Sequence, residues 1–400
     1  MAGKVSTTVS TDEVIGFRLN AHHLMHRVAS GQLLTVAGRC GLQNSPPGSA
    51  LLALHARVRD VTEELMHTAV ADDKSLLQTW SMRGAPFLFP TRDTPLFTTG
   101  VLPPTETALG HFLPGLAQAT AKLTLSIDQA VEMCGAEIGS VLSGRQLAIT
   151  ELGEELAARV GPRLTPSQRV VWEGEGPFAP RQSLGEGIVH FCIRVLTLQQ
   201  VVCFAARGGN KAQFVLVEEW LGQQVPDLAP GTARAELLRR YLRCYGPSTR
   251  ADFAAWMGVN AGDIGPWWDP LQDELTPVGH AGRSWILTED LDALTTAPRP
   301  EGVRMLPPRD PYTQLRDRET ILDKKHHQQV WRSVGEPGAI LADGRIVGTW
   351  RPRKSGRKLT ITIESFDTLR TSDKKLLHHE ATQIATLRGA SSADVVFEAR

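Results

Sequence analysis

The chain has 400 residues, 42% of them hydrophobic and 22% charged, and its 43 basic side chains balance its 43 acidic ones. This composition excludes a largely disordered chain and disfavours a protein that coats nucleic acid without specificity, and the length predicts roughly two to four domains. With no signal peptide and no run of about 18 apolar residues, we expect a cytoplasmic protein without a membrane segment. The five cysteines are widely spaced, without Cys-x-x-Cys or zinc-ligand spacing, which predicts reduced, buried thiols.

Residues 10 to 100 predict several helices followed by a hairpin. Thr11 or Asp12 can cap a helix, and further helices are expected near residues 22–30, 49–58 and 60–70. Residues 76–90 then read as two strands that turn at Arg83-Gly84, where glycine permits a tight turn.

A polar insert, residues 41–50, separates two of these helices. Gln43 follows the apolar Leu42, and Pro46 and Pro47 stiffen the backbone behind it. A fixed, uncharged amide can position a water molecule or a base edge. The alternative is a turn glutamine that satisfies backbone groups.

Residues 126–222 repeat the plan. Ser126 is expected to cap an apolar helix, Thr150 to begin a second, and residues 182–196 to form a long amphipathic helix. Residues 201–217 read as strand, turn and strand, with the turn at Gly208-Gly209-Asn210-Lys211.

Residues 232–294 give a third copy. A basic helix over 233–245 ends at Gly246-Pro247, Ser248 or Thr249 caps a short helix, another helix covers 263–273, and residues 275–287 form a hairpin. Helix, turn, helix and hairpin is the winged-helix plan, whose wing can reach phosphate or a groove.

The last hundred residues predict a small β-rich domain. The segment 339–350 alternates around Asp343-Gly344, and its neighbouring strand over 359–363 follows across a basic turn, residues 351–358. A helix over 372–387 and a strand over 395–397 come next. Thirteen Lys or Arg stand against six Asp or Glu between Arg304 and Lys358, which gives this quarter a phosphate-compatible surface. The whole pattern predicts an α+β protein.

Four segments together resemble one protein family. They are the Gly-Leu-Gln block at residue 41, Trp-Ser-Met-Arg-Gly-Ala-Pro at 80–86, the stretch 245–256, and Asp-Gly-Arg-Ile-Val-Gly-Thr-Trp at 343–350. In this order they are similar to the bacterial winged-helix superfamily of AlkZ- and YcaQ-type DNA glycosylases, and the resemblance covers nearly the whole chain.

The resemblance implies three tandem winged-helix motifs that form a C-shaped clamp on duplex DNA, over residues 1–110, 111–228 and 229–298, plus a β-rich C-terminal domain over 299–400. It also implies excision of bulky N7-alkylated purines, including interstrand cross-links from genotoxic natural products. The family's catalytic triplet is Gln-x-Gln or Gln-x-Asp. Its first position corresponds to Gln43, and its second is Ser45, which departs from the pattern.

We expect further contacts to DNA or the lesion from side chains around this loop, at two wing tips and in the basic turn. Trp80 and Met82 can equally be core residues, Arg83 a surface stack, and a run of charges a solvated face. The candidates are Asn44, Trp80, Met82, Arg83, Arg207, Lys211, Arg351, Arg353, Lys354, Arg357 and Lys358.

Two functions remain open from the sequence. The first is a monofunctional DNA glycosylase, acting in DNA repair or in antibiotic self-resistance, in which Gln43 positions water and Ser45 assists. The second is a winged-helix protein that binds DNA or a lesion without chemistry. Both predict a monomer that binds double-stranded DNA with alkylated purines, and neither requires a cofactor or a metal.

Overall fold

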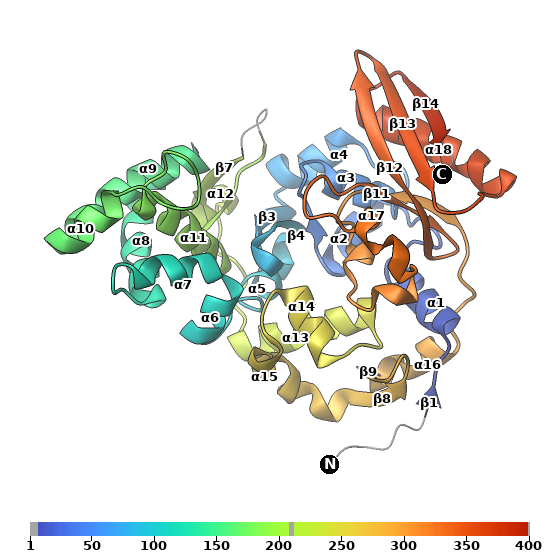
Figure 1. Cartoon of the computed structure of the whole chain (residues 1–400), viewed down its shortest axis with the longest axis horizontal. Helices are drawn as coiled ribbons and strands as arrows, with labels where there is room; N and C mark the ends of the chain where they lie inside the picture. Colours follow the sequence, from blue (N-terminus) through green and yellow to red (C-terminus); the bar gives the residue numbers. More distant parts are fainter. Residues whose placement is uncertain (1–6, 208–211, 399–400) are drawn as a thin grey trace. The chain divides into compact units, whose positions relative to one another are not determined.

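The computed structural model describes residues 7–207 and 212–398, which form two compact units. The first unit is built from residues up to Met66, Leu238–Trp256 and the residues from Leu271 onward. The second is built from His67–Leu237 and Met257–Pro270. The chain is a mixed α+β protein, as expected, and Figure 1 labels its helices and strands.

The first unit contains a five-stranded sheet in the order β10-β11-β12-β13-β14. All neighbours are antiparallel except β13 and β14, which run parallel because α18 (Thr371–Leu387) connects them. The helix packs along the sheet and buries Leu377 and Ile384 against Ile361 and Ile363. The strands are β10 (Val303–Leu306), β11 (Gly338–Ala342), β12 (Arg345–Ser355), β13 (Lys358–Ser365) and β14 (Ser392–Glu398).

A second sheet of this unit joins distant parts of the chain. Strand β1 (Thr7–Thr8) pairs in parallel with β8 (Leu275–Gly279), which forms a hairpin with β9 (Arg283–Leu287). Helix α1 (Thr11–Ala21) packs against α16 (Leu291–Thr295) beside it, with Val14 and Phe17 in the shared core.

The remaining helices assigned wholly or mainly to the first unit are short. They are α2 (Leu33–Gly38), α3 (Ser49–His55), α4 (Glu63–His67), α14 (Arg250–Met257) and α17 (His327–Val330).

The second unit is mainly helical, with strands in the order β4-β3-β6-β7-β5. Three helices pack on one another: α8 (Ile127–Leu142), α9 (Ile149–Val160) and α11 (Leu184–Leu198). The strands are β3 (Leu76–Trp80), β4 (Pro86–Pro90), β5 (Leu147–Ala148), β6 (Val202–Phe204) and β7 (Gln213–Leu216). The other helices are α5 (Thr94–Phe97), α6 (Glu106–Phe112), α7 (Pro114–Ala121), α10 (Pro166–Glu173), α12 (Val217–Leu221) and α15 (Gly265–Trp268), and α13 (Pro230–Tyr245) contains the boundary between the units.

The structure confirms the paired strands of the three expected hairpins and most long helices, and the turn predicted at Gly208-Gly209-Asn210-Lys211 lies outside the described residues. Ser126 caps α8 through a capping box with Gln129, as predicted. Helix α1, however, is capped by Ser10 with Glu13 instead of by Thr11 or Asp12, because only Ser10 has the extended backbone that aims its hydroxyl at the N–H of Glu13.

Four further local predictions were wrong. No α-helix forms over residues 22–30, because His22 ends α1 and the positive φ of His23, 53°, turns the chain. Thr150 does not cap α9 but is the second residue of that helix. The N-cap is Ala148, because the side chain of Glu151 accepts a hydrogen bond from the backbone N–H of Ala148. The helix expected over 263–273 is α15 followed by a 3₁₀ segment, Asp269–Glu274.

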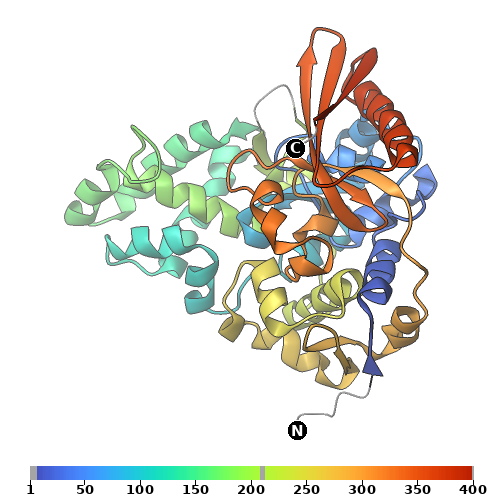
Figure 2. The ribbon, with the colours of Figure 1, turned by 45° about the vertical axis from the view of Figure 1, so that its right-hand side comes forward.

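The last of these four predictions concerns the basic turn over residues 351–358. Strand β12 continues through Arg351, Arg353 and Lys354 to Ser355, and the register with β13 is unbroken to the pair Ser355–Lys358. The turn itself is Gly356-Arg357, with φ of 57° at the glycine. Basic side chains fit a strand here because residues 351–358 are all exposed, and Figure 2 shows this long hairpin with β14 beside it, paired to β13 as far as Lys358.

Candidate active site

The Gly41–Ser49 loop is braced by the side chain of Asn44. Its Oδ1 accepts hydrogen bonds from the backbone N–H of Gly48 at 3.0 Å and from that of Ala50 at 3.4 Å. The loop leaves α2 through Gly41, whose φ of 71° suits glycine, and enters α3 through Gly48, whose φ is 88°. Asn44 therefore closes the loop on the N-terminus of α3, a role that the sequence does not reveal.

Gln43 lies in the two-residue strand β2 (Leu42–Gln43) and is 2% exposed, whereas Asn44 and Ser45 are half-buried. The sequence has no charged side chain from Gly41 to Leu54, so the loop offers only neutral dipoles. Such a surface does not repel a cationic purine, and it supplies no carboxylate base. Helix α3 fixes the loop from the other side, because its Leu52 is buried in the core of the C-terminal sheet.

Two histidines of the same unit stay neutral near pH 7. Burial, followed by the positive charge of Arg39, lowers the pKa of His23 to about 4. Burial, followed by the charge of Arg27, lowers the pKa of His55, the last residue of α3, to about 3. Arg27 is itself fixed, because it donates to the backbone oxygen of His55 at 2.7 Å and pairs with Glu380 at 2.7 and 2.8 Å.

The three candidates at the β3–β4 hairpin lie in different environments. Met82 is fully buried, and Ser81 beside it donates to the backbone oxygen of Phe97 at 2.6 Å. Trp80 packs against Phe204 and Phe214 with ring centroids 5.3 and 4.9 Å away, and the guanidinium of Arg194 lies over its ring. Met82 and Trp80 thus both have packing roles, and contact with a lesion stays a prediction for both.

Arg83 is half-buried in this hairpin turn. It adopts a positive φ of 58°, and its guanidinium lies 5.6 Å from the ring centroid of Phe87. In the second hairpin Arg207 is exposed, and Lys211 lies outside the described residues.

Some basic side chains of the β12–β13 hairpin are bound to neighbouring groups of the protein, whereas others extend away without such a partner in the described part of the chain. Arg351 donates to the backbone oxygen of Gly335 at 2.8 Å, Lys354 donates to that of Arg388 at 2.7 Å, and Lys358 pairs with Asp394 at 2.5 Å. Within the described residues, the side chains of Arg353 and Arg357 make no hydrogen bond or ion pair. These two arginines are the members of the cluster that are most available to a phosphate.

A family model supports the resemblance. The model of DNA glycosylase AlkZ-like proteins matches residues 36–387, which include the Gly41–Ser49 loop and the whole β12–β13 hairpin. The chain belongs to the AlkZ-like DNA glycosylase family. A relative from Streptomyces sahachiroi, described as an interstrand DNA cross-link repair glycosylase, is 27% identical over 396 residues, covering 96% of this chain and 98% of the relative.

The fold agrees with this family. The solved structure of Streptomyces sahachiroi DNA glycosylase AlkZ superposes with a TM-score of 0.74 at 25% identity, covering 98% of this chain and 100% of that one. No helix among the described residues of this AlkZ-like chain is both long and apolar enough to cross a membrane.

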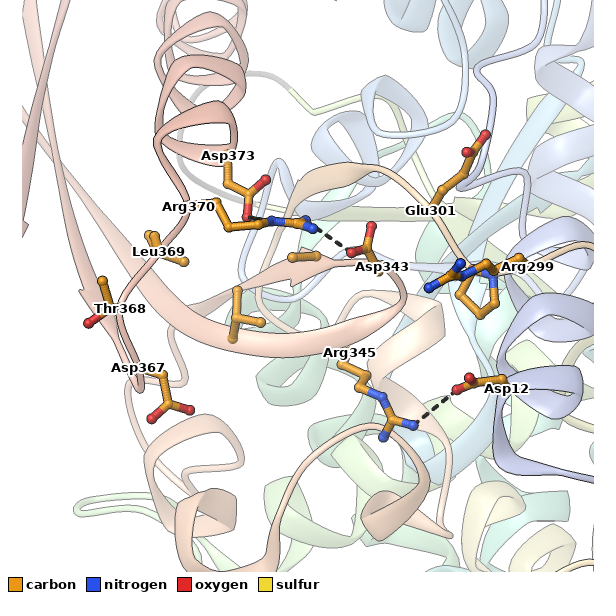
Figure 3. Close-up of a pocket in the computed structure, with 13 residues that line it drawn as sticks. Asp12, Arg299, Glu301, Asp343, Arg345, Asp367, Thr368, Leu369, Arg370 and Asp373 are labelled. Carbon is orange, nitrogen blue, oxygen red and sulfur yellow. Dashed lines mark hydrogen bonds and ion pairs between the residues drawn. The ribbon is translucent and has the colours of Figure 1, made fainter.

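Figure 3 shows a charged pocket of about 660 Å³. None of the site residues predicted from the sequence lines it. Two of the three arginines that line it are paired: Arg345 with Asp12 at 3.2 Å, and Arg370 with Asp343 at 3.0 Å and Asp373 at 2.7 Å. These pairs neutralise much of the positive charge on its walls, so the pocket is a poor candidate for the DNA phosphate site.

Sequence spacing missed one cluster in this AlkZ-like chain. The side chains of His22, Cys40 and Cys244 are buried, and their potential metal-ligating atoms all lie within 4.8 Å of one another. The residues are too far apart in sequence for any ligand motif, and only the fold brings them together. All five cysteines fall within the described residues and are buried and unpaired by disulfides, as predicted.

Proposed function

We propose that the protein is a monofunctional DNA glycosylase that hydrolyses the N-glycosidic bond of bulky N7-alkylpurine adducts or interstrand cross-links. Membership of the AlkZ-like family supports the glycosylase, and the cross-link substrate rests on the description of the Streptomyces sahachiroi relative. The observation that supports the assignment is the braced Gly41–Ser49 loop, which lies inside the matched range and contains Gln43, the residue that we propose for the first position of the family triplet.

The proposed chemistry makes modest demands on the loop. Alkylation at N7 places a positive charge on the purine, so the electron pair of the C1′–N9 bond moves to the base, which leaves neutral. Water then adds to C1′ of the oxocarbenium-like sugar and loses a proton. The Gln43 amide can orient this water, and the Ser45 hydroxyl can accept a hydrogen bond from it. In this proposal duplex binding brings the lesion sugar to Gln43, which is 2% exposed without DNA.

DNA binding would come from the hairpins. The β3–β4, β6–β7 and β8–β9 hairpins would serve as wings of three tandem winged-helix motifs that close on a duplex as a clamp, with the β12–β13 hairpin supplying further phosphate contacts. The same proposal includes a monomeric state, a cytoplasmic location and a role in self-resistance. It also includes the boundaries 1–110, 111–228, 229–298 and 299–400, and contacts to DNA or the lesion from Asn44, Trp80, Met82, Arg83, Arg207 and Lys211.

The test is an excision assay on a duplex with one N7-alkylguanine. The protein is incubated with the labelled duplex, and hot alkali then cleaves abasic sites. We expect strand cleavage above a no-enzyme control only after alkali, because a monofunctional enzyme uses water and leaves the abasic strand intact. Absence of cleavage across adduct sizes and on a cross-linked duplex would refute the enzyme assignment.

A non-catalytic lesion-binding protein is the second candidate. One observation favours it: the second triplet position holds Ser45, which cannot act as a carboxylate base, and the charge-free loop holds no other acid. This candidate predicts binding to the alkylated duplex that is tighter than to the unmodified duplex, without any release of the base.

A further inference from the structure

The buried cluster of His22, Cys40 and Cys244 plays no part in the proposed excision chemistry. His22 is the residue that ends α1, Cys40 stands two residues after α2, and Cys244 lies in the last turn of α13. His22, Cys40 and Cys244 are 2%, 5% and 1% exposed, respectively. Three helix ends therefore meet at two thiols and one imidazole, and Cys40 is only three residues before Gln43.

The imidazole of His22 is positioned but lacks a partner on one side. Its ring stands edge-on to Tyr245 and to Tyr312, with centroids 5.2 and 5.5 Å away. Its Nε2 is buried and, among the described residues, makes no hydrogen bond. A buried polar nitrogen without a partner loses the hydrogen bonds that it would make to water in the unfolded chain, so such an atom calls for an explanation.

The thiols of Cys40 and Cys244 have only weak partners. Cys244 Sγ lies 3.7 Å from the backbone oxygen of Arg39, and Cys40 Sγ lies 3.7 Å from the hydroxyl of Tyr245. The single hydroxyl proton of Tyr245 goes to the backbone oxygen of Pro311 at 2.8 Å. Both sulfur atoms therefore keep lone pairs that can bind a metal ion.

We propose that His22, Cys40 and Cys244 form a binding site for a thiophilic metal ion, with Zn²⁺ the expected occupant. Zn–S bonds of about 2.3 Å and a Zn–N bond of about 2.1 Å place tetrahedral ligand atoms roughly 3.5–3.8 Å apart. Three atoms already within 4.8 Å of one another reach this spacing by small side-chain rotations. The fourth position is open to a water molecule or to the hydroxyl oxygen of Tyr245.

Charge balance favours this occupant. Binding converts two thiols to thiolates and releases two protons, so the ion's two positive charges meet two negative ones and no net charge is buried. A disulfide between Cys40 and Cys244 would use only the sulfurs and would leave His22 Nε2 without a partner. The metal ion satisfies all three groups at once, and it ties the segment before Gln43 to α1 and α13.

The test uses Co²⁺ as a spectroscopic probe on the full-length, reduced and chelator-treated protein. We expect a thiolate-to-cobalt charge-transfer band in the near ultraviolet and visible d–d bands of tetrahedral intensity, saturating at one equivalent and displaced by Zn²⁺. Cys40→Ser and Cys244→Ser should each weaken Co²⁺ binding by at least about tenfold. Cys134→Ser is the matched control, because it removes a buried thiol of the second unit.

Three results would overturn the proposal. They are a wild-type protein with no cobalt bands, serine variants that bind Co²⁺ as tightly as the Cys134→Ser control, or a Cys40–Cys244 disulfide found by mass spectrometry in protein purified without zinc. If a serine variant does not fold, the wild-type spectrum and His22→Asn still decide the matter. Because the readout is metal binding and not base excision, its failure is distinct from a failure of the proposed glycosylase activity.

Discussion

Arg57 and Asp310 form a two-point ion pair in the interior of the first unit. Arg57 Nη1 donates to Asp310 Oδ2 at 2.8 Å and Nη2 donates to Oδ1 at 2.6 Å, while the two side chains are 2% and 0% exposed. Arg57 Nη1 also donates to the backbone oxygen of Ala53 in α3 at 2.8 Å. The pair therefore joins the end of α3, the helix that follows the Gly41–Ser49 loop, to the start of the C-terminal region.

Asp310→Asn is expected to lower the free energy of unfolding by about 3 to 5 kcal/mol, because it leaves the Arg57 charge buried without its counter-ion. Arg57→Met/Asp310→Leu should recover most of the loss. Denaturant unfolding measures both. Asp12→Asn is the control, since it breaks an exposed pair with Arg345, 3.2 Å apart, worth about 1 kcal/mol or less. Equal stability of Asp310→Asn and Asp12→Asn would contradict the prediction.

Gln43→Ala is expected to abolish base excision from an N7-alkylguanine duplex while leaving duplex affinity within about twofold, because in the proposed mechanism the amide positions water and does not bind phosphate. Excision is measured by alkali-dependent strand cleavage and affinity by fluorescence anisotropy. Gln223→Ala removes an exposed glutamine of the second unit and should leave both unchanged. Full activity in Gln43→Ala would remove this residue from the active site.

Ser45→Asp is expected to increase the excision rate by roughly tenfold or more. The change places a carboxylate where the family pattern has Gln or Asp, and general base catalysis typically contributes about 10²- to 10⁴-fold. Single-turnover excision rates measure the gain, with Ser45→Ala as the control that removes the hydroxyl without adding a base. A folded Ser45→Asp protein that is no faster than wild type would show that Ser45 is not the second catalytic position.

Arg353→Ala/Arg357→Ala is expected to weaken duplex binding equally for damaged and undamaged DNA. Each lost phosphate contact should reduce the magnitude of the slope of log K against log salt by about 0.9. The slope of the double variant should therefore be smaller in magnitude by about 2. Affinities at several salt concentrations measure this slope. Lys122→Ala/Arg181→Ala removes the same charge from exposed positions of the second unit. An unchanged slope in the hairpin variant would exclude these arginines from the interface.

The stability of the protein should fall as the pH drops from 6.5 toward 4. The pKa of His23 is lowered to about 4 and that of His55 to about 3, so the unfolded chain binds protons in this range and the folded chain does not. Each such histidine gives a slope of about 1.4 kcal/mol per pH unit, with greater stability at the higher pH.

Unfolding free energies between pH 4 and 7 test this dependence. His55→Gln should flatten the slope, because the glutamine amide does not titrate. His26→Gln should leave the slope unchanged, since the side chain of His26 is 82% exposed. The same slope in His55→Gln and wild type would show that His55 is not responsible.

Much of the fold could be predicted because its signals are local. Ser126 with Gln129 begins α8, and the Asp343-Gly344 turn separates β11 from β12, each through residues three or fewer positions apart. Predictions were wrong where tertiary context decided the outcome. Residues 351–355 continue a strand only because β13 pairs with them, and neighbouring basic residues carry no sign of that partner.

The site was predictable only in part. Gln43 could be selected because the family resemblance marks it, but neither the brace from Asn44 to Gly48 nor the burial of Gln43 has a sequence signature. The cluster of His22, Cys40 and Cys244 was missed for a different reason. Ligand motifs detect residues that one turn or one helix holds together, whereas these three meet only after three separate helix ends have packed.

The division of the chain into units has a consequence for its synthesis. The second unit is nearly continuous, from His67 to Leu237, whereas the first needs residues from both ends of the chain. Strand β1 cannot pair until Val278 and Gly279 have left the ribosome, and Arg27 cannot meet Glu380 until that residue has also been synthesised. The N-terminal segment therefore stays unpaired in the nascent chain, with its apolar side chains exposed to water, while the second unit folds. We therefore expect a chaperone that shields nascent chains to bind within residues 7–66 until the later residues of the first unit have been synthesised.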